Sequence, residues 1–323
     1  MARYPFKATV NKFMADLEPN VSKSTAYDKR RKLILIAKIL DKLVDEGKIK
    51  TDNPKKVTTK DIIEYVKFRR ASGVSESTLS KDISLLNQLF KFVGNPAVMT
   101  FRATAGIYRP HSYTGRKEPL SDEAIEKIYE LARRTEDWSV MEGCMIVVFT
   151  VSTGIRPQES RIYDIGGISL MGDRSTVYIE KVKGAGDYGK PRVAPIMDGA
   201  EDIFRKYLRM RFEKLKKHGL ETDAMFPNFR YPEKKYLTQQ AFARLKKPVE
   251  ELIGESFEIR AGRRAFGQRA INNNHDMSDI SVAMGHASTK TTEGYYCRTM
   301  NSRAVNNMLK RKNTFKEACM EDY

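Results

Sequence analysis

The sequence predicts a mainly helical protein with a small β-sheet, an α+β chain divided into two domains. Its 323 residues exceed what a single hydrophobic core usually organises. Apolar residues recur at helical spacing through most of the chain, whereas alternation of apolar and polar residues is confined to a short stretch near its middle. We therefore expect a helical first domain and a second domain that combines helices with the small sheet.

Three helices are expected in the first hundred residues, over 24–47, 58–70 and 75–94. In the first of them Gly47 supplies a stop signal. In the third, Ser75 or Ser77 could cap the amino end. Both longer segments carry an apolar stripe on one face, so these helices should pack together and form the first domain, assigned to residues 1–100.

The second domain is assigned to residues 118–300 and follows a basic, Pro-containing segment over 95–118 that is interpreted as linker, with 101–117 as its central part. Ser121 should cap a helix over 120–134, and an apolar helix near 138–151 should be the buried centre of the domain. The segments STVYIEKV and KPRVAPI, separated by GAGDYG, are expected to be strands, and the chain reads as helical again from residue 198 onward.

The charge balance favours a polyanionic partner. The chain holds 58 Lys and Arg against 41 Asp and Glu, a net charge of +17. Residues 1–110 carry 22 of these basic side chains and only 11 of the acidic ones, so the first domain is the more electropositive. Such a distribution indicates binding to nucleic acid rather than to a neutral or acidic substrate.

Other classes of protein are disfavoured. The three cysteines form neither a disulfide framework nor a CxxC pattern, and the four histidines are too scattered to suggest a zinc site, so no metal and no cofactor is expected. Cys144 lies in an apolar run and should be core. The longest apolar run is too short to span a membrane and the amino end lacks a signal-peptide core, so we expect a cytoplasmic, nucleoid-associated protein.

Two arginine-containing motifs stand out. In TGIRPQES, Gly154 should end the buried helix and Pro157 should begin a new one, which makes Arg156 the N-cap residue beside free backbone N–H groups. Arg156 could simply pair with Glu159, or it could bind a phosphate while held by that carboxylate. In EIRAGRRAFGQRA, Arg260 and Arg263 are three residues apart on one helical face, and planar guanidinium groups suit bidentate binding of phosphate.

These motifs carry a resemblance. Arg156 in TGIRPQE, Arg263 in RxxR, His286 in MGHAS and a Tyr in TTEGYY stand in the order and spacing of the tyrosine recombinase family, which includes phage integrases and Xer-type recombinases. His286 follows Arg263 by 23 residues and precedes Tyr295 by nine. The family's catalytic domain resembles residues 118–300, and the basic helical domain before it resembles the family's core-binding domain. Each motif alone is weak, but the ordered set is specific.

The resemblance implies roles for five side chains. Arg156 and Arg263 match the arginines that bind the nonbridging oxygens of the scissile phosphate, and His286 matches the histidine that hydrogen-bonds the same phosphate. Glu159 matches an acidic position that supports the site. Lys183 best matches the hairpin lysine that protonates the leaving 5′ oxygen, because KGAG followed by KPRVAPI resembles the family's hairpin.

Three positions of the resemblance allow more than one assignment. Lys181 and Lys190 compete with Lys183 for the role of general acid. Where the family usually has a histidine, this chain has Arg260, whose guanidinium is too weak an acid to serve readily as a base at neutral pH. Removal of the tyrosine proton must then fall to water, to His286 or to a Lys, or Arg260 must lower the pKa of the phenol by its charge. The nucleophile is expected to be Tyr295, with Tyr296 as the alternative.

The resemblance also implies a double-stranded DNA partner and a tetramer on two recombination sites. Residues 301–323 could form a helix exchanged between protomers or folded back on their own domain. The alternatives in function are a type IB topoisomerase and a catalytically inactive DNA-binding regulator of the same fold. Any one basic side chain could be a solvated helix face, but together the following are expected to contact DNA phosphates: Lys29, Arg30, Arg31, Lys32, Arg69, Arg70, Lys81, Arg102 and Arg109.

Overall fold

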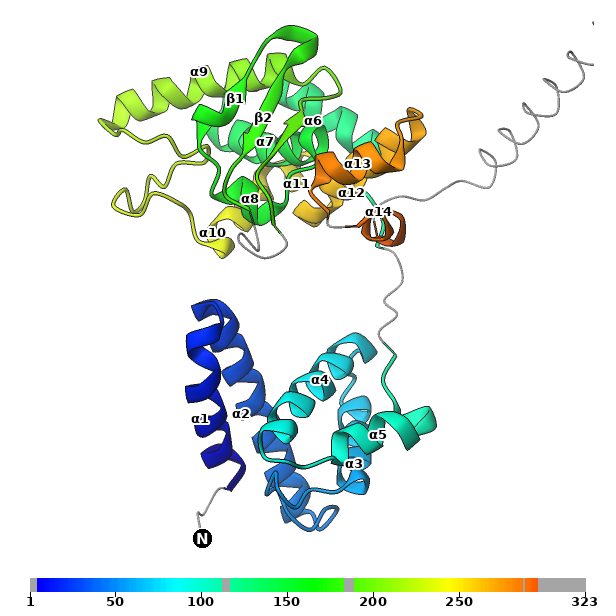
Figure 1. Ribbon diagram of the computed structural model, residues 1–323. Coiled ribbons are helices and arrows are strands. Elements are labelled where there is room, and N and C mark those ends of the chain that lie inside the picture. The colour runs from blue at the N-terminus through cyan, green and yellow to red at the C-terminus, as the bar shows by residue number, and fades with distance from the viewer. Residues whose placement is uncertain (1–4, 112–116, 183–188, 287, 296–323) are drawn as a thin grey trace, which may run out of the picture. The chain divides into compact units, whose positions relative to one another are not determined.

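The computed structural model describes residues 5–111, 117–182, 189–286 and 288–295, and it divides the chain into two compact units, 1–115 and 116–323 (Figure 1). Both units are mainly helical, and the second also contains a small sheet. The predicted fold class is therefore confirmed. Each unit has its own hydrophobic core, so each is described by itself.

The first unit is built from the helices α1 (Pro5–Leu17), α2 (Lys23–Asp45), α3 (Thr59–Ala71), α4 (Glu76–Phe92) and α5 (Ala97–Thr104). The N-caps of α2, α3 and α4 are Ser22, Thr58 and Ser75, each of which accepts a backbone N–H with its side-chain oxygen. Such a cap stabilises a helix by about 1 kcal/mol. The cap signals in the sequence thus explain where these helices begin, and of the two candidates it is Ser75 that caps α4.

Two features of this unit differ from the expectation. The segment interpreted as linker over 95–118 begins with α5, whose Val98 and Phe101 are fully buried in the core of the unit. Two prolines and two glycines obscure this short helix in the sequence. The second feature is α1, which had not been expected and which buries Phe6, Val10 and Met14 against α2 and α4.

The second unit is organised around α7 (Trp138–Thr153), as expected for a helix that is apolar on all sides. Residues 141–153 are all buried, including Cys144. The helices that pack against α7 are α6 (Asp122–Arg134), α9 (Glu201–His218), α11 (Lys247–Ile253) and α12 (Ile259–Asn272). Ser121 caps α6, as predicted.

The sheet lies beside α7 and has three antiparallel strands in the order β1 (Ile168–Ser169), β2 (Thr176–Ile179) and β3 (Arg192–Pro195). Strands β2 and β3 are the two that alternation of apolar and polar residues predicts. The pair Ile179 and Arg192 closes the ladder on the side of the hairpin connection, and both side chains are buried. The register therefore brings an arginine into the interior of the unit.

The remaining helices are short and lie around this frame. They are α8 (Pro157–Arg161), α10 (Gln239–Arg244), α13 (Met277–Met284) and α14 (Thr289–Tyr295), with 3-10 turns at Ile165–Gly167 and Gly172–Arg174. The 3-10 turns Glu18–Asn20 and Gly106–Tyr108 belong to the first unit. The proposed tail helix over 301–323 lies outside the described residues.

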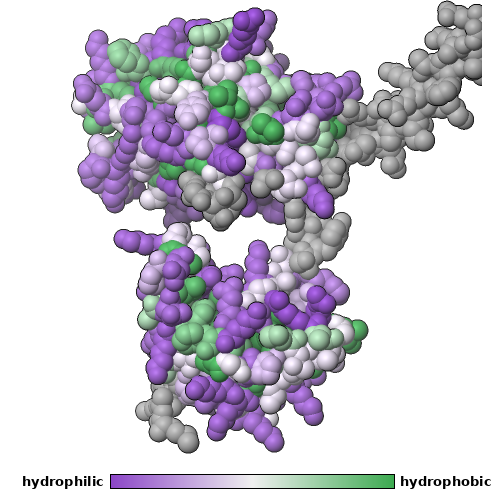
Figure 2. Space-filling model, viewed as in Figure 1, coloured by the Kyte–Doolittle hydropathy of each residue, from purple (hydrophilic) through white to green (hydrophobic). Residues whose placement is uncertain are grey.

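The described surface is largely polar. In Figure 2, hydrophilic residues cover most of the visible face of each unit, and hydrophobic residues appear there as small separate patches. Within the described ranges, no helix combines the length and the apolarity needed to cross a membrane.

One buried acidic group in α7 predicts an unusual pH dependence of stability. Glu142 is buried, and burial raises the pKa of its carboxyl to about 8 although the positive charge of Lys214 opposes this shift. Between about pH 4.5 and 8 the folded state holds a proton that the unfolded state has lost, so the free energy of unfolding should fall with rising pH, by up to about 1.4 kcal/mol per pH unit.

Replacing Glu142 with Gln should therefore raise the melting temperature more at pH 8 than at pH 5. The chain's single tryptophan, Trp138, stacks on Tyr207 in the same core, so its fluorescence reports melting of this unit. The exposed Glu130→Gln is the matched control and should show no such difference. An equal gain from Glu142→Gln at both pH values would contradict the prediction.

Candidate active site

Arg156 is placed by a sharp turn between α7 and α8. Gly154 ends α7 in the left-handed conformation with φ of 64°, and a Cβ at this position would lie 2.6 Å from Cδ1 of Phe266 in α12. Only glycine satisfies both conditions. The chain then reverses, and Arg156 becomes the N-cap of α8 with Pro157 as the first helical residue, as the sequence predicts.

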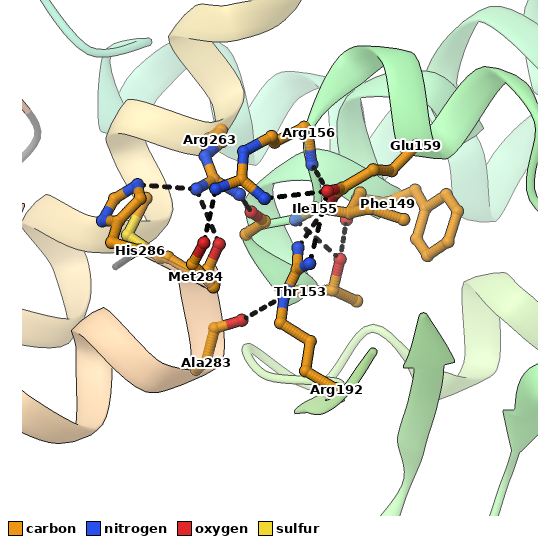
Figure 3. Close-up of polar contacts among 12 residues, drawn as sticks. Phe149, Thr153, Ile155, Arg156, Glu159, Arg192, Arg263, Ala283, Met284 and His286 are labelled. Atoms are coloured by element: carbon orange, nitrogen blue, oxygen red, sulfur yellow. Dashed lines mark hydrogen bonds and ion pairs between the residues drawn. The ribbon is translucent and has the colours of Figure 1, made fainter. Parts of the chain in front are cut away.

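The Arg156 guanidinium is held by two partners and remains 23% exposed. Its Nη1 donates to Oε1 of Glu159 at 2.8 Å, and its Nη2 donates to the carbonyl of Gly285. The backbone N–H of Arg156 donates to the other oxygen of Glu159 at 3.1 Å. One carboxylate thus fixes both the main chain and the side chain of Arg156, which lies toward Arg263 in Figure 3.

Glu159 is 1% exposed and accepts from a second arginine. Arg192 of β3 donates from Nη2 to Oε2 at 2.7 Å and from Nη1 to Oε1 at 3.3 Å. Burial is the largest influence on this carboxyl and favours its neutral form. The hydrogen bonds and charges of Arg192 and Arg156 together outweigh burial and hold the pKa of Glu159 below its usual value. Glu159 is therefore an ionised carboxylate shared by two guanidinium groups.

Arg263 comes from α12 and is 1% exposed. Its Nη1 donates to the carbonyl of Gly154, and its Nη2 donates to the carbonyl of Met284 at 2.7 Å. The neighbouring Gly262 allows α12 to pack closely on α7, because a Cβ there would lie 2.4 Å from Oγ1 of Thr150. This close packing carries Arg263 to the end of α7, next to Arg156 (Figure 3).

His286 follows α13, which ends at Gly285 in the left-handed conformation. Its Nε2 lies 2.7 Å from Nη2 of Arg263 and its Nδ1 lies 2.7 Å from Oγ1 of the buried Thr292. Because a guanidinium can only donate, Nε2 accepts from Arg263 and Nδ1 carries the proton that is donated to Thr292. Burial, followed by the charges of Arg263, Arg156 and Arg192, lowers the pKa of His286 to about 3. The imidazole is therefore neutral.

The structure brings Arg156, Arg263 and His286 to one place, where residues far apart in sequence meet at the end of α7. The nucleophile candidate Tyr295 is the last residue of α14, nine residues beyond His286, and its side chain lies outside the described part of the chain. Tyr296, the alternative, also lies outside it.

The other predicted site residues are placed differently. Arg260 lies one turn before Arg263 on α12, but its side chain is exposed. Lys183 lies outside the described residues. Of its two rivals, Lys190 is exposed, whereas Lys181 forms an ion pair with Asp164 and donates to Tyr236 Oη at 2.5 Å. These contacts, that with Asp164 foremost, raise the pKa of Lys181 above its usual value and disfavour release of its proton.

The predicted DNA-contacting side chains fall into two groups. The first is exposed and includes Arg31, Lys81, Arg102 and Arg109, of which Arg102 also donates to Oγ of Ser84 at 2.9 Å. The second is bound to neighbours within the first unit: Lys29 to Gln88, Arg30 to Glu18 and Asn11, Arg69 to Asp82, and Arg70 to Glu76. Arg69 is only 12% exposed and stabilises the buried Asp82, which also accepts from Tyr65, so its guanidinium serves the core of the unit. Lys32 is half-buried on α2.

Arg192 is the member of this site that sequence reasoning did not single out. A signal was present, because the alternation of KPRVAPI places Arg192 on the same face of the strand as Ala194, and an arginine on a buried face needs a partner. The partner, Glu159, lies 33 residues away in sequence. Only the fold identifies it.

The chain is similar to known proteins over most of its length. The family model of the phage integrase family matches residues 118–302, and that of the phage integrase N-terminal SAM-like domain matches residues 10–94. Among curated proteins, tyrosine recombinase XerC of Herpetosiphon aurantiacus is 23% identical over 77% of this chain and 78% of its own length. Tyrosine recombinase XerD of Listeria monocytogenes is 23% identical over 78% and 82%.

Solved structures share the fold. The Tn1549 transposon integrase in complex with transposon right end DNA superposes with a TM-score of 0.66 at 15% identity, over 94% of this chain and 99% of that one. XerH recombinase bound to a difH substrate gives a TM-score of 0.61 at 18% identity, over 89% and 90%. A lambda integrase tetramer bound to a Holliday junction gives 0.62 at 15%, over 91% and 78%. Since the family model spans more than half of its residues, the chain belongs to the phage integrase family of tyrosine recombinases.

Proposed function

We propose that the protein is a site-specific DNA recombinase that cleaves and rejoins DNA through a covalent 3′-phosphotyrosine intermediate. The observation that carries this proposal is the convergence of Arg156, Arg263 and the neutral His286 at the turn that leads into α14, which ends at Tyr295. Two cationic groups and a neutral hydrogen-bonding group at one point suit a phosphodiester that gains negative charge during reaction.

In the proposed reaction the phenolic oxygen of Tyr295 attacks phosphorus, the bond to the 5′ oxygen breaks, and Lys183 supplies the proton that makes this oxygen a hydroxyl. A second 5′ hydroxyl then attacks the phosphotyrosine and releases the phenol. Each step exchanges one phosphoester bond for another, so the covalent intermediate conserves the bond energy and no ATP is required. The guanidinium groups of Arg156 and Arg263 face the charge that develops on the phosphorane.

The phenol proton needs an acceptor. The low pKa of His286 makes its imidazole a weak base, and Arg260 is permanently charged, so water is the acceptor in this proposal. Arg260, exposed one turn before Arg263, would then favour the phenolate by its charge. To hydrogen-bond the phosphate as a neutral group, His286 would carry its proton on Nε2 in the DNA complex, with Nδ1 accepting from the hydroxyl of Thr292.

The proposed partner is double-stranded DNA with specific recombination sites. The protein would act on this DNA at the nucleoid, in the cytoplasm. The basic first unit offers exposed charges for backbone contacts, so binding should weaken with salt. The lambda integrase neighbour is a tetramer on a Holliday junction, which supports a tetramer of this chain on two sites.

Trapping on DNA tests the proposal directly. A nicked suicide duplex that contains the recombination site loses its short 5′ product and should leave a covalent protein–DNA adduct. Peptide mass spectrometry should find the nucleotide on Tyr295, and Tyr295→Phe should abolish the adduct while Tyr296→Phe retains it. An adduct that survives both substitutions would falsify the proposed nucleophile. Absence of any adduct would indicate a DNA-binding regulator, and relaxation of plasmids that lack a site would indicate a topoisomerase.

Arg156→Ala should lower the single-turnover cleavage rate by about 100- to 1000-fold, because it removes a fixed donor to the phosphorane. The affinity for DNA, measured by gel shift over a range of protein concentrations, should change little. The control is Arg31→Ala, which removes an exposed charge of the first unit and should weaken binding without changing the rate at saturation. A rate unchanged by Arg156→Ala would remove Arg156 from the chemistry.

The imidazole of His286 should remain neutral well below its ordinary titration range. In proton NMR its Cε1–H resonance, assigned by its loss in His286→Asn, should show no titration between pH 5 and 8 in the free protein, because burial and three arginines lower the pKa to about 3. A midpoint near 6.5 would show that the cationic surroundings do not act on this ring.

A further inference from the structure

Arg192 contacts two parts of the candidate active site that come from separate segments of the chain, α8 and the end of α13. It lies on β3, its side chain is 7% exposed, and its head group is planar against both oxygens of Glu159. The third nitrogen, Nε, donates to the carbonyl of Ala283 near the end of α13 at 3.0 Å. Figure 3 shows this guanidinium between Glu159 on α8 and Ala283 on α13, beneath Arg156 and Arg263.

The aliphatic part of the Arg192 side chain also packs against the turn that leads to His286. A Cβ at Gly285 would lie 2.8 Å from Cδ and 2.9 Å from Nε of Arg192, and Gly285 has φ of 66°. This contact leaves no room for a side chain on the turn. The carbonyl oxygen of Gly285 also accepts a hydrogen bond from Nη2 of Arg156. Arg192 therefore lies beneath the backbone segment on which Arg156 and His286 both depend.

We infer that Arg192 is a positioning residue for the reaction: it holds Glu159 as the carboxylate that fixes Arg156, and it holds the end of α13 that presents His286. This inference rests on the proposed function. Arg192 itself need not touch DNA, because it acts through Glu159 and through the backbone of α13.

The chemistry of the side chain supports this role. A guanidinium presents parallel N–H groups that match both oxygens of a carboxylate and still has Nε for a third acceptor. A lysine at this position would keep the charge but could not make the paired contact. Glu159 in turn needs both of its oxygens, since one accepts from the side chain of Arg156 and the other from its backbone N–H.

Loss of Arg192 should act through the ionisation of Glu159. Burial, the largest influence on this carboxyl, would then meet less opposition, so the pKa of Glu159 should rise. Once protonated, Glu159 cannot accept from Arg156 with both oxygens, and Arg156 loses its fixed position. The charged and titratable groups around this carboxyl are Arg156 on α8, Arg192 on β3, Arg263 on α12, His286 after α13, and Asp164, Glu180, Lys181 and Asp223 in the adjoining cleft.

The experiment measures the single-turnover rate of adduct formation on the suicide duplex from pH 5.5 to 8.5 with full-length protein, and divides each variant's rate by that of wild type at the same pH. Ionisation of the nucleophilic tyrosine affects wild type and every variant alike, so its effect on the rate cancels in this ratio. The variants are Arg192→Gln, Arg192→Lys, Glu159→Gln and the double variant Arg192→Gln with Glu159→Gln. Trp138 fluorescence melting identifies the folded pH range of each.

For Arg192→Gln the ratio should fall on the acidic side, by about tenfold for each pH unit below the raised pKa of Glu159. Arg192→Lys should show the same fall displaced to lower pH, and it carries the test if the Gln variant does not fold. Glu159→Gln should be slow at every pH, without an acidic fall. The double variant should also lack the acidic fall and should be slower than Glu159→Gln alone by the same factor at every pH, because Arg192→Gln also removes the contact with Ala283 that does not depend on Glu159.

Three results would overturn the inference. The first is a wild-type rate in the Arg192 variants, and the second is a loss of rate in these variants that is equal at all pH values. The third is an acidic fall that persists in the double variant, which would assign this fall to His286 instead of Glu159. Failure of wild type to form an adduct would reject the proposed function itself. The two failures are therefore distinguishable.

Discussion

The ion pair network around Glu159 is the interaction on which the candidate active site depends. Arg156, Arg192 and Arg263 gather in a partly or fully buried space, where like charges repel and an unpaired charge is costly. The carboxylate of Glu159 allows two of these guanidinium groups to lie close together, and backbone carbonyls orient the third. The resulting site is cationic but fixed in geometry before DNA binds, a form of preorganisation that favours charge developing in a transition state.

The scaffold supports this network with rigid elements. The site side chains come from α8, β3, α12 and the turn after α13, and α7 or the sheet packs behind them. Glycines at 154, 262 and 285 allow the close approaches that a side chain would prevent. Each approach brings a backbone carbonyl or a helix to within reach of an arginine. Precision thus comes from close packing of these main-chain segments against the side chains of Phe266, Thr150 and Arg192 on neighbouring elements.

Local signals predicted much of the fold because they act over a few residues. Ser75 and Ser121 cap helices, Gly154 ends α7, and alternation marks β2 and β3, since each effect depends on neighbours in sequence. The helix α5 was interpreted as linker because its stabilisation comes from burial of Phe101 in a core assembled from other helices. A short helix without a cap has little local signal to show.

By itself, the sequence determined the family-specific set of arginine, histidine and tyrosine residues, because their types and spacing are one-dimensional properties of the chain. The tertiary structure decided what surrounds each of them. It paired Arg192 with Glu159, turned Arg260 to solvent while burying Arg263, made His286 a neutral acceptor, and drew Arg69 into the core of the first unit. Burial and charge depend on residues distant in sequence, and pKa values and partners follow from them.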